Sequence, residues 1–222
     1  MLFVIAGICL AFLSGNVSGD SGYTLFFPNK GVTDYVNIWG MRSLSQFTIC
    51  FWMKSSDTAP GTAFSYSVPS RDNELIVFNY ENLALYINGD HRSTGISAND
   101  GDWHQICATW ENVNGEWKLY KDGKMEKTGT GLKTGYVIQA EGSLVLGQEQ
   151  DSTGGKFDQN QSFQGSLTNV NVWSHVLPES TIKELSGCCR AGEGNVYMWS
   201  DFIYAIKGNP RLVIPPTCKC VY

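Results

Sequence analysis

Short segments of β-forming residues recur along this chain, and their spacing is the strongest constraint on its fold. Eight such segments are separated mostly by Gly, Asn, Asp or Pro, which favour turns. They are YTLFF, FTICFWMK, ELIVFNYE, LALYING, HQICATWEN, EWKLYKDGK, SLVLGQ and LTNVNVW. Aromatic residues make up 13% of the chain. Together with the number of strands, they favour a two-sheet antiparallel sandwich over an α/β fold.

The sequence also predicts one hairpin and one helix. EWKLYKDGKMEK has the pattern of two strands that turn at Asp122-Gly123. The segment 178–185, PESTIKEL, begins with Pro and Glu and is followed by a Gly stop signal. We therefore expect an all-β, lectin-like jelly-roll sandwich with one short α-helix, whose Ile182 and Leu185 lie on one face of the sandwich.

The first nineteen residues, MLFVIAGICLAFLSGNVSG, have no charged side chain and end in small residues. This pattern predicts a secretory signal peptide at 1–19. Its apolar run is shorter than the roughly 20 residues that span a bilayer, and no later segment is apolar enough, so we expect no transmembrane segment. Residues 20–222 then form one domain, secreted to the extracellular space. The net charge of −5 argues against nucleic acid or anionic membrane as partners.

Six of the seven cysteines follow the predicted signal peptide, an even number that suits an oxidising compartment. They are Cys50, Cys107, Cys188, Cys189, Cys218 and Cys220. We place Cys50 and Cys107 on different core strands, where a bond would contribute about 4 kcal/mol. For the other four, we favour two bonds that tie the tail, at about 210–222, to the loop after the helix, with the pairing undetermined. The competing hypothesis is bonding between subunits.

The segment GQEQDSTGGKFDQNQ, 147–161, is rich in side-chain oxygen. Glu149, Asp151 and Asp158 lie within ten residues and have only Lys156 as a neighbouring base. Such acids repel one another unless a cation neutralises them. Their oxygens are hard ligands, and no His or Cys accompanies them, so calcium is favoured over zinc or copper. The competing interpretation is a solvated polar loop, since the spacing is not that of an EF-hand.

The arrangement of these ligands follows from the preceding strand. If the strand SLVLGQEQD continued through Glu149 and Asp151, both carboxylates would face the same side. The two glycines that follow would let the chain turn back and bring Asp158 and Gln161 within reach.

GQEQDSTGGKFDQNQSFQG, together with SRDNELIVF at 70–78 and QICATWEN at 105–112, resembles the pentraxin family, in particular the short pentraxins. The resemblance covers nearly the whole chain after the signal peptide. The family signature near the second cysteine is matched at Cys107, Thr109 and Trp110, whereas Gln105 holds its His position. The resemblance implies a disulfide between Cys107 and Cys50.

Carried over position by position, the resemblance implies two calcium ions that share carboxylates. The first would be held by Asp72, Asn73, Glu149, the backbone carbonyl of Gln150, and Asp151. The second would be held by Glu149, Asp151, Asp158 and Gln161. Because the second ion has fewer protein ligands, a phosphate oxygen could complete its shell.

The family's ligands are phosphocholine and phosphoethanolamine, whose amine lies against an apolar pocket. Here Ile76, Phe78 and Tyr86 match pocket positions, and His91 stands where an acid would select choline. The neighbouring Asp90 is a candidate substitute. We expect calcium-dependent binding of phosphate monoesters, with the two amines competing comparably. The competing interpretation is that Phe78 and Tyr86 only pack the strands.

The resemblance further implies a cyclic homo-oligomer, typically a pentamer, that recognises microbial or damaged-cell surfaces in innate immunity through multivalent binding. Whether complement's recognition subunit is a partner is left open by the sequence. Asp122 matches the family's complement-binding acid, but Ser186 replaces the tyrosine that accompanies it. Asn160-Gln161-Ser162 is a glycosylation sequon that we expect to be unoccupied, since a glycan would crowd the calcium loop.

Enzyme activity is not expected. Glu149 and Asp151 superficially suggest a glycosidase pair, but the further Glu of such enzymes is absent, with Thr153 and Gly154 in its place. The three histidines are scattered, and no serine or cysteine motif accompanies them. The alternative function is another calcium-dependent binding module, either a lectin or a laminin-G-like adhesion domain.

Overall fold

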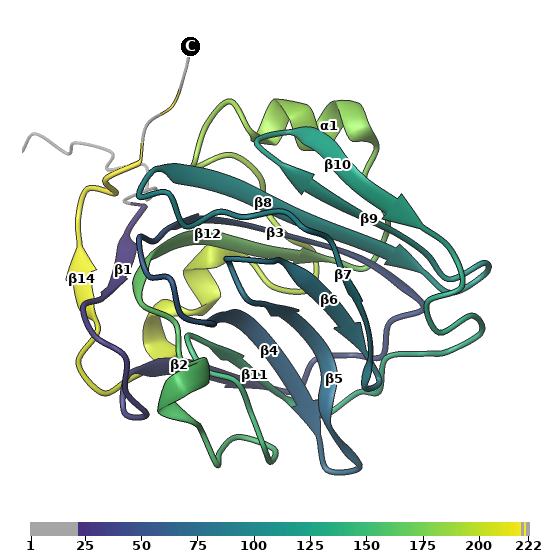
Figure 1. Cartoon of the computed structure of the whole chain (residues 1–222), viewed down its shortest axis with the longest axis horizontal. Helices are drawn as coiled ribbons and strands as arrows, with labels where there is room; N and C mark the ends of the chain where they lie inside the picture. The colour runs from purple at the N-terminus through teal and green to yellow at the C-terminus, as the bar shows by residue number, and fades with distance from the viewer. Residues whose placement is uncertain (1–21, 219, 221–222) are drawn as a thin grey trace, which may run out of the picture.

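The computed structural model describes residues 22–218 and Cys220, so the predicted signal peptide lies outside the described residues. Within them the chain forms two antiparallel sheets of seven strands each, which pack face to face (Figure 1). The predicted all-β sandwich is therefore confirmed. In spatial order, the first sheet contains β10 (Lys124–Gly129), β9 (Glu116–Lys121), β8 (Trp103–Glu111), β3 (Gln46–Lys54), β12 (Gly165–Trp173), β1 (Thr24–Phe27) and β14 (Arg211–Val213).

The second sheet carries the segments that contact residues 147–162, which we call the acidic loop. In spatial order it contains β13 (Ile206–Lys207), β2 (Tyr35–Trp39), β11 (Ser143–Leu146), β4 (Thr62–Val68), β5 (Arg71–Phe78), β6 (Ala84–Ile87) and β7 (Asp90–Ser93). The described helical segments are α1 (Glu179–Leu185) and three short 3-10 turns, η1 (Gln159–Gln161), η2 (Trp199–Asp201) and η3 (Ile203–Ala205).

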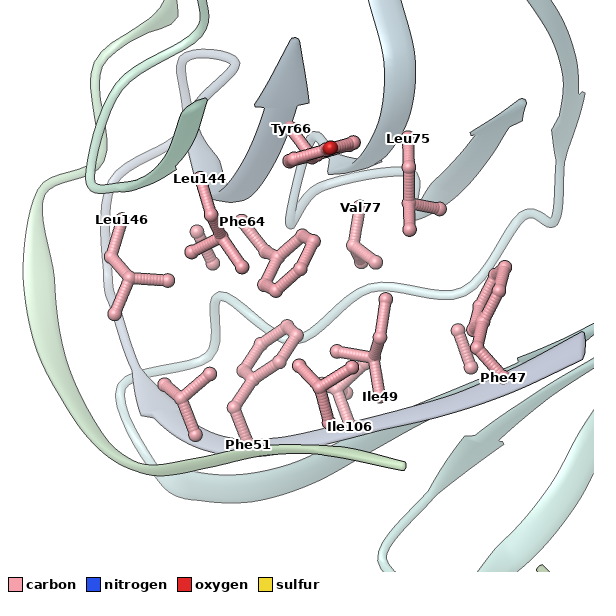
Figure 2. Close-up of a cluster of buried hydrophobic side chains, with 14 of the residues drawn as sticks. Phe47, Ile49, Phe51, Phe64, Tyr66, Leu75, Val77, Ile106, Leu144 and Leu146 are labelled. Atoms are coloured by element: carbon pink, nitrogen blue, oxygen red, sulfur yellow. The ribbon is translucent and has the colours of Figure 1, made fainter. Parts of the chain in front are cut away.

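The core lies between the sheets and is built from alternate residues of each strand. Phe47, Ile49 and Phe51 of β3 point inward, while the residues between them point to the outer face. Figure 2 shows these rings and aliphatic groups meeting side chains from the opposite sheet. The labelled residues, each at most 1% exposed, are Phe47, Ile49, Phe51, Phe64, Tyr66, Leu75, Val77, Ile106, Leu144 and Leu146.

The described chain has more strands than the sequence pattern indicated. The additional strands are β2, β4, β7, β13 and β14. Of these, β7, β13 and β14 lie at sheet edges, and β7 has the wholly polar sequence DHRS. An edge strand is held mainly by backbone hydrogen bonds to one neighbour, so it needs no apolar pattern that a sequence reading could detect.

The first disulfide lies beneath the helix. Cys50 and Cys107 occupy directly opposite positions on β3 and β8 and are bonded. They form a buried cluster with Tyr120 and Ile182, against which Leu185 packs. The helix α1 thus covers the outer face of the first sheet through the two residues that its sequence pattern indicated.

Two further disulfides join the loop after α1 to the C-terminal tail. These bonds are Cys188–Cys220 and Cys189–Cys218. Cys189 and Cys218 are buried together with Trp52, and Trp103 packs against the cluster. The tail therefore covers a second patch on the outer face of the first sheet, and all four cysteines are bonded within the chain.

We predict that replacing Cys188, Cys189, Cys218 and Cys220 together by Ala lowers the free energy of unfolding by about 3 to 4 kcal/mol, because the outer of the two nested bonds closes a loop of 32 residues. Guanidinium unfolding followed by tryptophan fluorescence measures this, with the exposed Val113→Ala as control. Unchanged stability would contradict the prediction. Wild-type multimers on a non-reducing gel that collapse under reductant would instead support bonding between subunits.

An ion-pair cluster fixes the turn of the β9–β10 hairpin. The Oδ1 atom of Asp122 accepts a hydrogen bond from the Gln105 backbone N–H at 2.9 Å, and its Oδ2 lies 2.7 Å from His104 Nδ1. The Nε2 atom of His104 lies 2.9 Å from the carboxylate of Asp100. The hydrogen bond with Asp122 raises the pKa of His104, and the hydrogen bond with Asp100 adds to the increase. Burial of the ring acts in the opposite direction, but the pKa is raised overall. The acid that the resemblance relates to complement is thus engaged within the hairpin.

We predict that His104→Gln destabilises the protein more at pH 6 than at pH 9. A raised pKa means that the imidazolium's stabilisation is complete below the usual value near 6.5 and disappears as pH rises through the raised pKa. Thermal unfolding of wild type and variant at both pH values measures the difference, and exposed His175→Gln serves as control. The same destabilisation at both pH values would contradict the prediction.

Candidate metal centre

The acidic loop lies against the outer face of the second sheet. Buried Gln150 donates from Nε2 to the backbone carbonyls of Ser65 at 3.1 Å and Ser143 at 3.0 Å. Its Oε1 accepts a hydrogen bond from Gly154 N–H at 2.8 Å. One amide side chain therefore holds the loop to β4 and β11 and also fixes the turn within it.

That turn places the two halves of the loop beside each other. Ser152 and Gly155 exchange backbone hydrogen bonds of 3.2 and 2.9 Å, and Gly154 has a φ of +75°. A Cβ at Gly154 would lie 2.8 Å from the ring of Trp39, so glycine is required by space as well as by conformation. The chain turns back at the glycines, as the sequence indicated.

The backbone that leads to Glu149 and Asp151 differs from the expected continuous strand. Strand β11 ends at Leu146, so Glu149 and Asp151 do not belong to a continuing strand. The side-chain bonds of Gln150 replace the strand ladder here and hold the loop at Ser65 and Ser143. Strand periodicity therefore does not place these two acids, and a tertiary contact does.

Four carboxylates around the loop are near enough to interact electrostatically. Burial raises the pKa of Glu149 to about 7, and the charges of Asp151, Asp72 and Asp158 add to this increase. Asp72 comes from the start of β5, while Asp158 precedes η1, so three separate segments contribute. Without a cation, the ionised groups repel one another at this place.

Two of the predicted calcium ligands have buried oxygens without a hydrogen-bond partner. These atoms are Asn73 Oδ1 and Glu149 Oε2. A buried acceptor without a donor costs about 1 to 3 kcal/mol, whereas a bound cation would satisfy it. The residues present therefore fit calcium, which takes oxygen ligands of this kind.

The carboxylates do not form a metal cage by themselves. Within residues 22–218 and 220, no three His, Cys, Asp or Glu side chains lie close enough together to hold an ion. Asp158 also accepts hydrogen bonds from the backbone N–H and Nδ2 of Asn160, at 2.9 and 3.0 Å. Amide and backbone oxygens, such as those of Asn73 and Gln150, are therefore needed to complete a shell.

The predicted pocket residues form a row beside the acids. Ile76, Tyr86 and His91 occupy directly paired positions across β5, β6 and β7. Tyr86 stacks on His91 with ring centroids 4.7 Å apart, and Phe78 meets Tyr86 edge-on at 6.0 Å. Burial raises the pKa of Tyr86, and the charge of Glu149 adds to the increase. Because Ile76 is buried, a ligand would meet Phe78, Tyr86 and His91.

A hollow of about 330 Å³ adjoins the acids at the β4–β5 turn. Its lining includes Arg71, Asp72, Asp151 and Thr153. No local sequence pattern indicates that Arg71 lines this hollow or that the Gln150 side chain holds the loop. Both depend on contacts between segments that are distant in sequence.

Comparison with known proteins decides the family. The model of the Pentaxin family matches residues 24–216. The chain belongs to the pentraxin family. This confirms the resemblance seen in the sequence, and family members generally bind calcium.

Curated proteins similar to this pentraxin include longer chains. The sushi, von Willebrand factor type A, EGF and pentraxin domain-containing protein 1 of Rattus norvegicus is 40% identical over 198 residues, covering 86% of this chain and 6% of that protein. Neuronal pentraxin-1 of Homo sapiens is 38% identical over 201 residues, covering 87% of this chain and 46% of that protein. The pentraxin chain thus spans less than half the length of both relatives.

Solved structures agree on the fold. The native heptameric SAP-like pentraxin from Limulus polyphemus has a TM-score of 0.77 and 25% identity, covering 88% of this chain and 95% of that chain. The extracellular region of zebrafish Gpr126/Adgrg6 has a TM-score of 0.66 and 19% identity, covering 89% and 27%, and shows the fold alone. No helix in the described part of this pentraxin has the length and apolar character to cross a membrane.

We predict that Glu149→Gln leaves the melting temperature in chelator at pH 8 equal to or above that of wild type, because it removes one of four repelling charges. The same change should abolish most of the increase in melting temperature that calcium gives wild type. Differential scanning calorimetry with chelator and with calcium measures both. A variant that is less stable in chelator yet responds fully to calcium would contradict the account.

Proposed function

We propose that this pentraxin is an extracellular, calcium-dependent binding protein for phosphate monoesters such as phosphocholine and phosphoethanolamine. The observation that supports it best is that the buried oxygens of Asn73 and Glu149 have no hydrogen-bond partner, at a place where the charges of three further carboxylates act on Glu149. Family members are binding proteins rather than enzymes, and the proposal accordingly includes no catalytic step.

The chain's residues divide into two overlapping ligand sets. Asp72, Asn73, Glu149, the carbonyl of Gln150 and Asp151 would hold one calcium ion, and Glu149, Asp151, Asp158 and Gln161 a second. Bound calcium would supply a positive centre with open positions for a phosphate oxygen. The buried position of Glu149 keeps its carboxylate away from competing water, and Gln150 holds the loop in place.

The aromatic row would contact the amine end of the ligand. The faces of Phe78 and Tyr86 suit a quaternary ammonium. The neighbouring acid Asp90 forms an exposed ion pair with Lys133 at 3.2 Å, so Lys133 competes with the amine for this carboxylate. With His91 rather than an acid on the row, the site has no carboxylate dedicated to choline, and the two amines should compete comparably.

Multivalency would turn weak binding at one site into tight binding to repetitive microbial or damaged-cell surfaces. The heptameric Limulus pentraxin supports a homo-oligomer, and its subunit number differs from that of a pentamer. Complement's recognition subunit is left out of the proposal, because the Asp122 carboxylate is engaged with His104 and Gln105.

The proposal is tested by retention on phosphocholine and phosphoethanolamine resins with calcium, followed by elution with chelator. We expect wild type and the exposed control Asp102→Asn to be retained, and Asp151→Asn to flow through. Retention of wild type that survives chelator would overturn the proposal. If wild type binds calcium but neither resin, and galactose-type sugars compete for its binding elsewhere, the lectin alternative is favoured.

We predict that Tyr86→Leu weakens phosphocholine binding by about 0.5 to 2 kcal/mol without changing calcium affinity, because it removes the aromatic face but no calcium ligand. Calorimetric titration with each ligand measures the two affinities. Tyr204→Leu is the matched control, since Tyr204 is 94% exposed and lies in η3. Equal phosphocholine affinity in Tyr86→Leu and wild type would show that Tyr86 only packs the strands.

A further inference from the structure

The ammonium of Lys30 contacts oxygens from two segments that are distant in sequence, 57–60 and 160–162. It donates hydrogen bonds to the backbone carbonyls of Pro60 and of Ser162, the latter at 3.1 Å, and lies 3.5 Å from the carbonyl of Asn160. It also lies 3.1 Å from Asp57 Oδ2. Two of these oxygens belong to the end of the acidic loop, so Lys30 ties that end to the segment 57–60.

The position of Lys30 is itself fixed by Asp57. The side chains of Lys30 and Asp57 are each only 15% exposed. Burial raises the pKa of Asp57, but hydrogen bonds from the Tyr80 hydroxyl, the Ala59 N–H and Lys30 outweigh it and lower the pKa overall. Asp57 is therefore a stable anion that holds the ammonium beneath the loop.

A second contact joins the same two segments. The Gly31 N–H donates to Ser162 Oγ at 3.1 Å, and that hydroxyl donates to the carbonyl of Gln159 at 2.8 Å. The carbonyls of Gln159, Asn160 and Ser162 are thus all bound, two by Lys30 and one by the hydroxyl. Gln161, a proposed ligand of the second ion, lies within this turn.

The other end of the loop is held by the same N-terminal segment. Buried Gln148 donates from Nε2 to the backbone carbonyls of Gly31 at 2.7 Å and Asp34 at 3.0 Å. Gln148 directly precedes Glu149, whereas Lys30 acts at 160–162. The contacts of Lys30 and Gly31 therefore lie at the part of the loop that distinguishes the second ion from the first, and Lys30 is the one of the two that acts through its side chain.

We propose that Lys30 is a positioning residue for the second calcium ion, which it supports by holding the turn 159–162 through backbone carbonyls. The inference rests on the proposed function, since it assigns a role within the same site. Residues that orient metal ligands without touching the metal commonly change metal affinity by about 10-fold to 100-fold. Loss of the ammonium should therefore weaken the second ion and leave the first unchanged.

The experiment compares wild type, Lys30→Met, the double variant Lys30→Met with Asp57→Asn, and the exposed control Lys127→Met. The double variant removes both charges of the pair, so it avoids the unpaired buried carboxylate of the single variant. In chelator, we expect faster hydrogen exchange at 159–162 in both Lys30 variants but not in the control. The melting temperature in chelator should recover in the double variant relative to Lys30→Met.

Calorimetric titration with calcium alone then separates positioning from stability. We expect the second-ion affinity to fall by about tenfold or more in both Lys30 variants, with the first ion unchanged. Recovery of that affinity in the double variant along with its stability would overturn the inference, as would wild-type affinity in Lys30→Met. If wild type binds no calcium, the proposed function fails together with the inference. If wild type binds two ions and the Lys30 variants bind them equally well, only the inference about Lys30 fails.

Discussion

The repulsion among Asp72, Glu149, Asp151 and Asp158 is the constraint on which the rest of this site depends. The four carboxylates come from β5, the acidic loop and the start of η1, and one of them is buried. Such groups destabilise one another unless protons or cations neutralise them. Buried unpartnered oxygens on Asn73 and Glu149 favour the cation. The loop must then be held from outside, because its own charges push it apart.

The sandwich holds the acidic loop on its outer face, and its core residues take no part in this. Alternate residues of β4 and β5 fill the space between the sheets, which leaves the outer face free to receive the loop and the aromatic row. Gln150 attaches the loop to β4 and β11, and Lys30 attaches its far end to the N-terminal segment. Polar contacts thus position the acids, with Gln148 adding a further hold on the loop, while the apolar core gives the sheet its rigidity.

The sequence predicted what local patterns encode and missed what distant contacts decide. The β-forming segments of β3 and β8, the helix α1 and the turn at Asp122 all have local signals, and the structure contains each. The edge strand β7 has no apolar pattern, so it was not foreseen. Among the site residues, the acids were predicted to form one site from their residue types and from the family resemblance. The supporting roles of Gln150 and Lys30 arise from contacts across 85 and 132 positions, which no local pattern reports.

The central claim is that this outer face binds calcium through shared carboxylates. Equilibrium dialysis of the metal-free protein against radioactive calcium tests it most directly, because it counts bound ions without assuming a ligand. The account predicts two calcium ions per chain at saturation, in agreement with the two overlapping ligand sets. Saturation without bound calcium would contradict the account, and a single ion per chain would contradict the shared, two-ion arrangement.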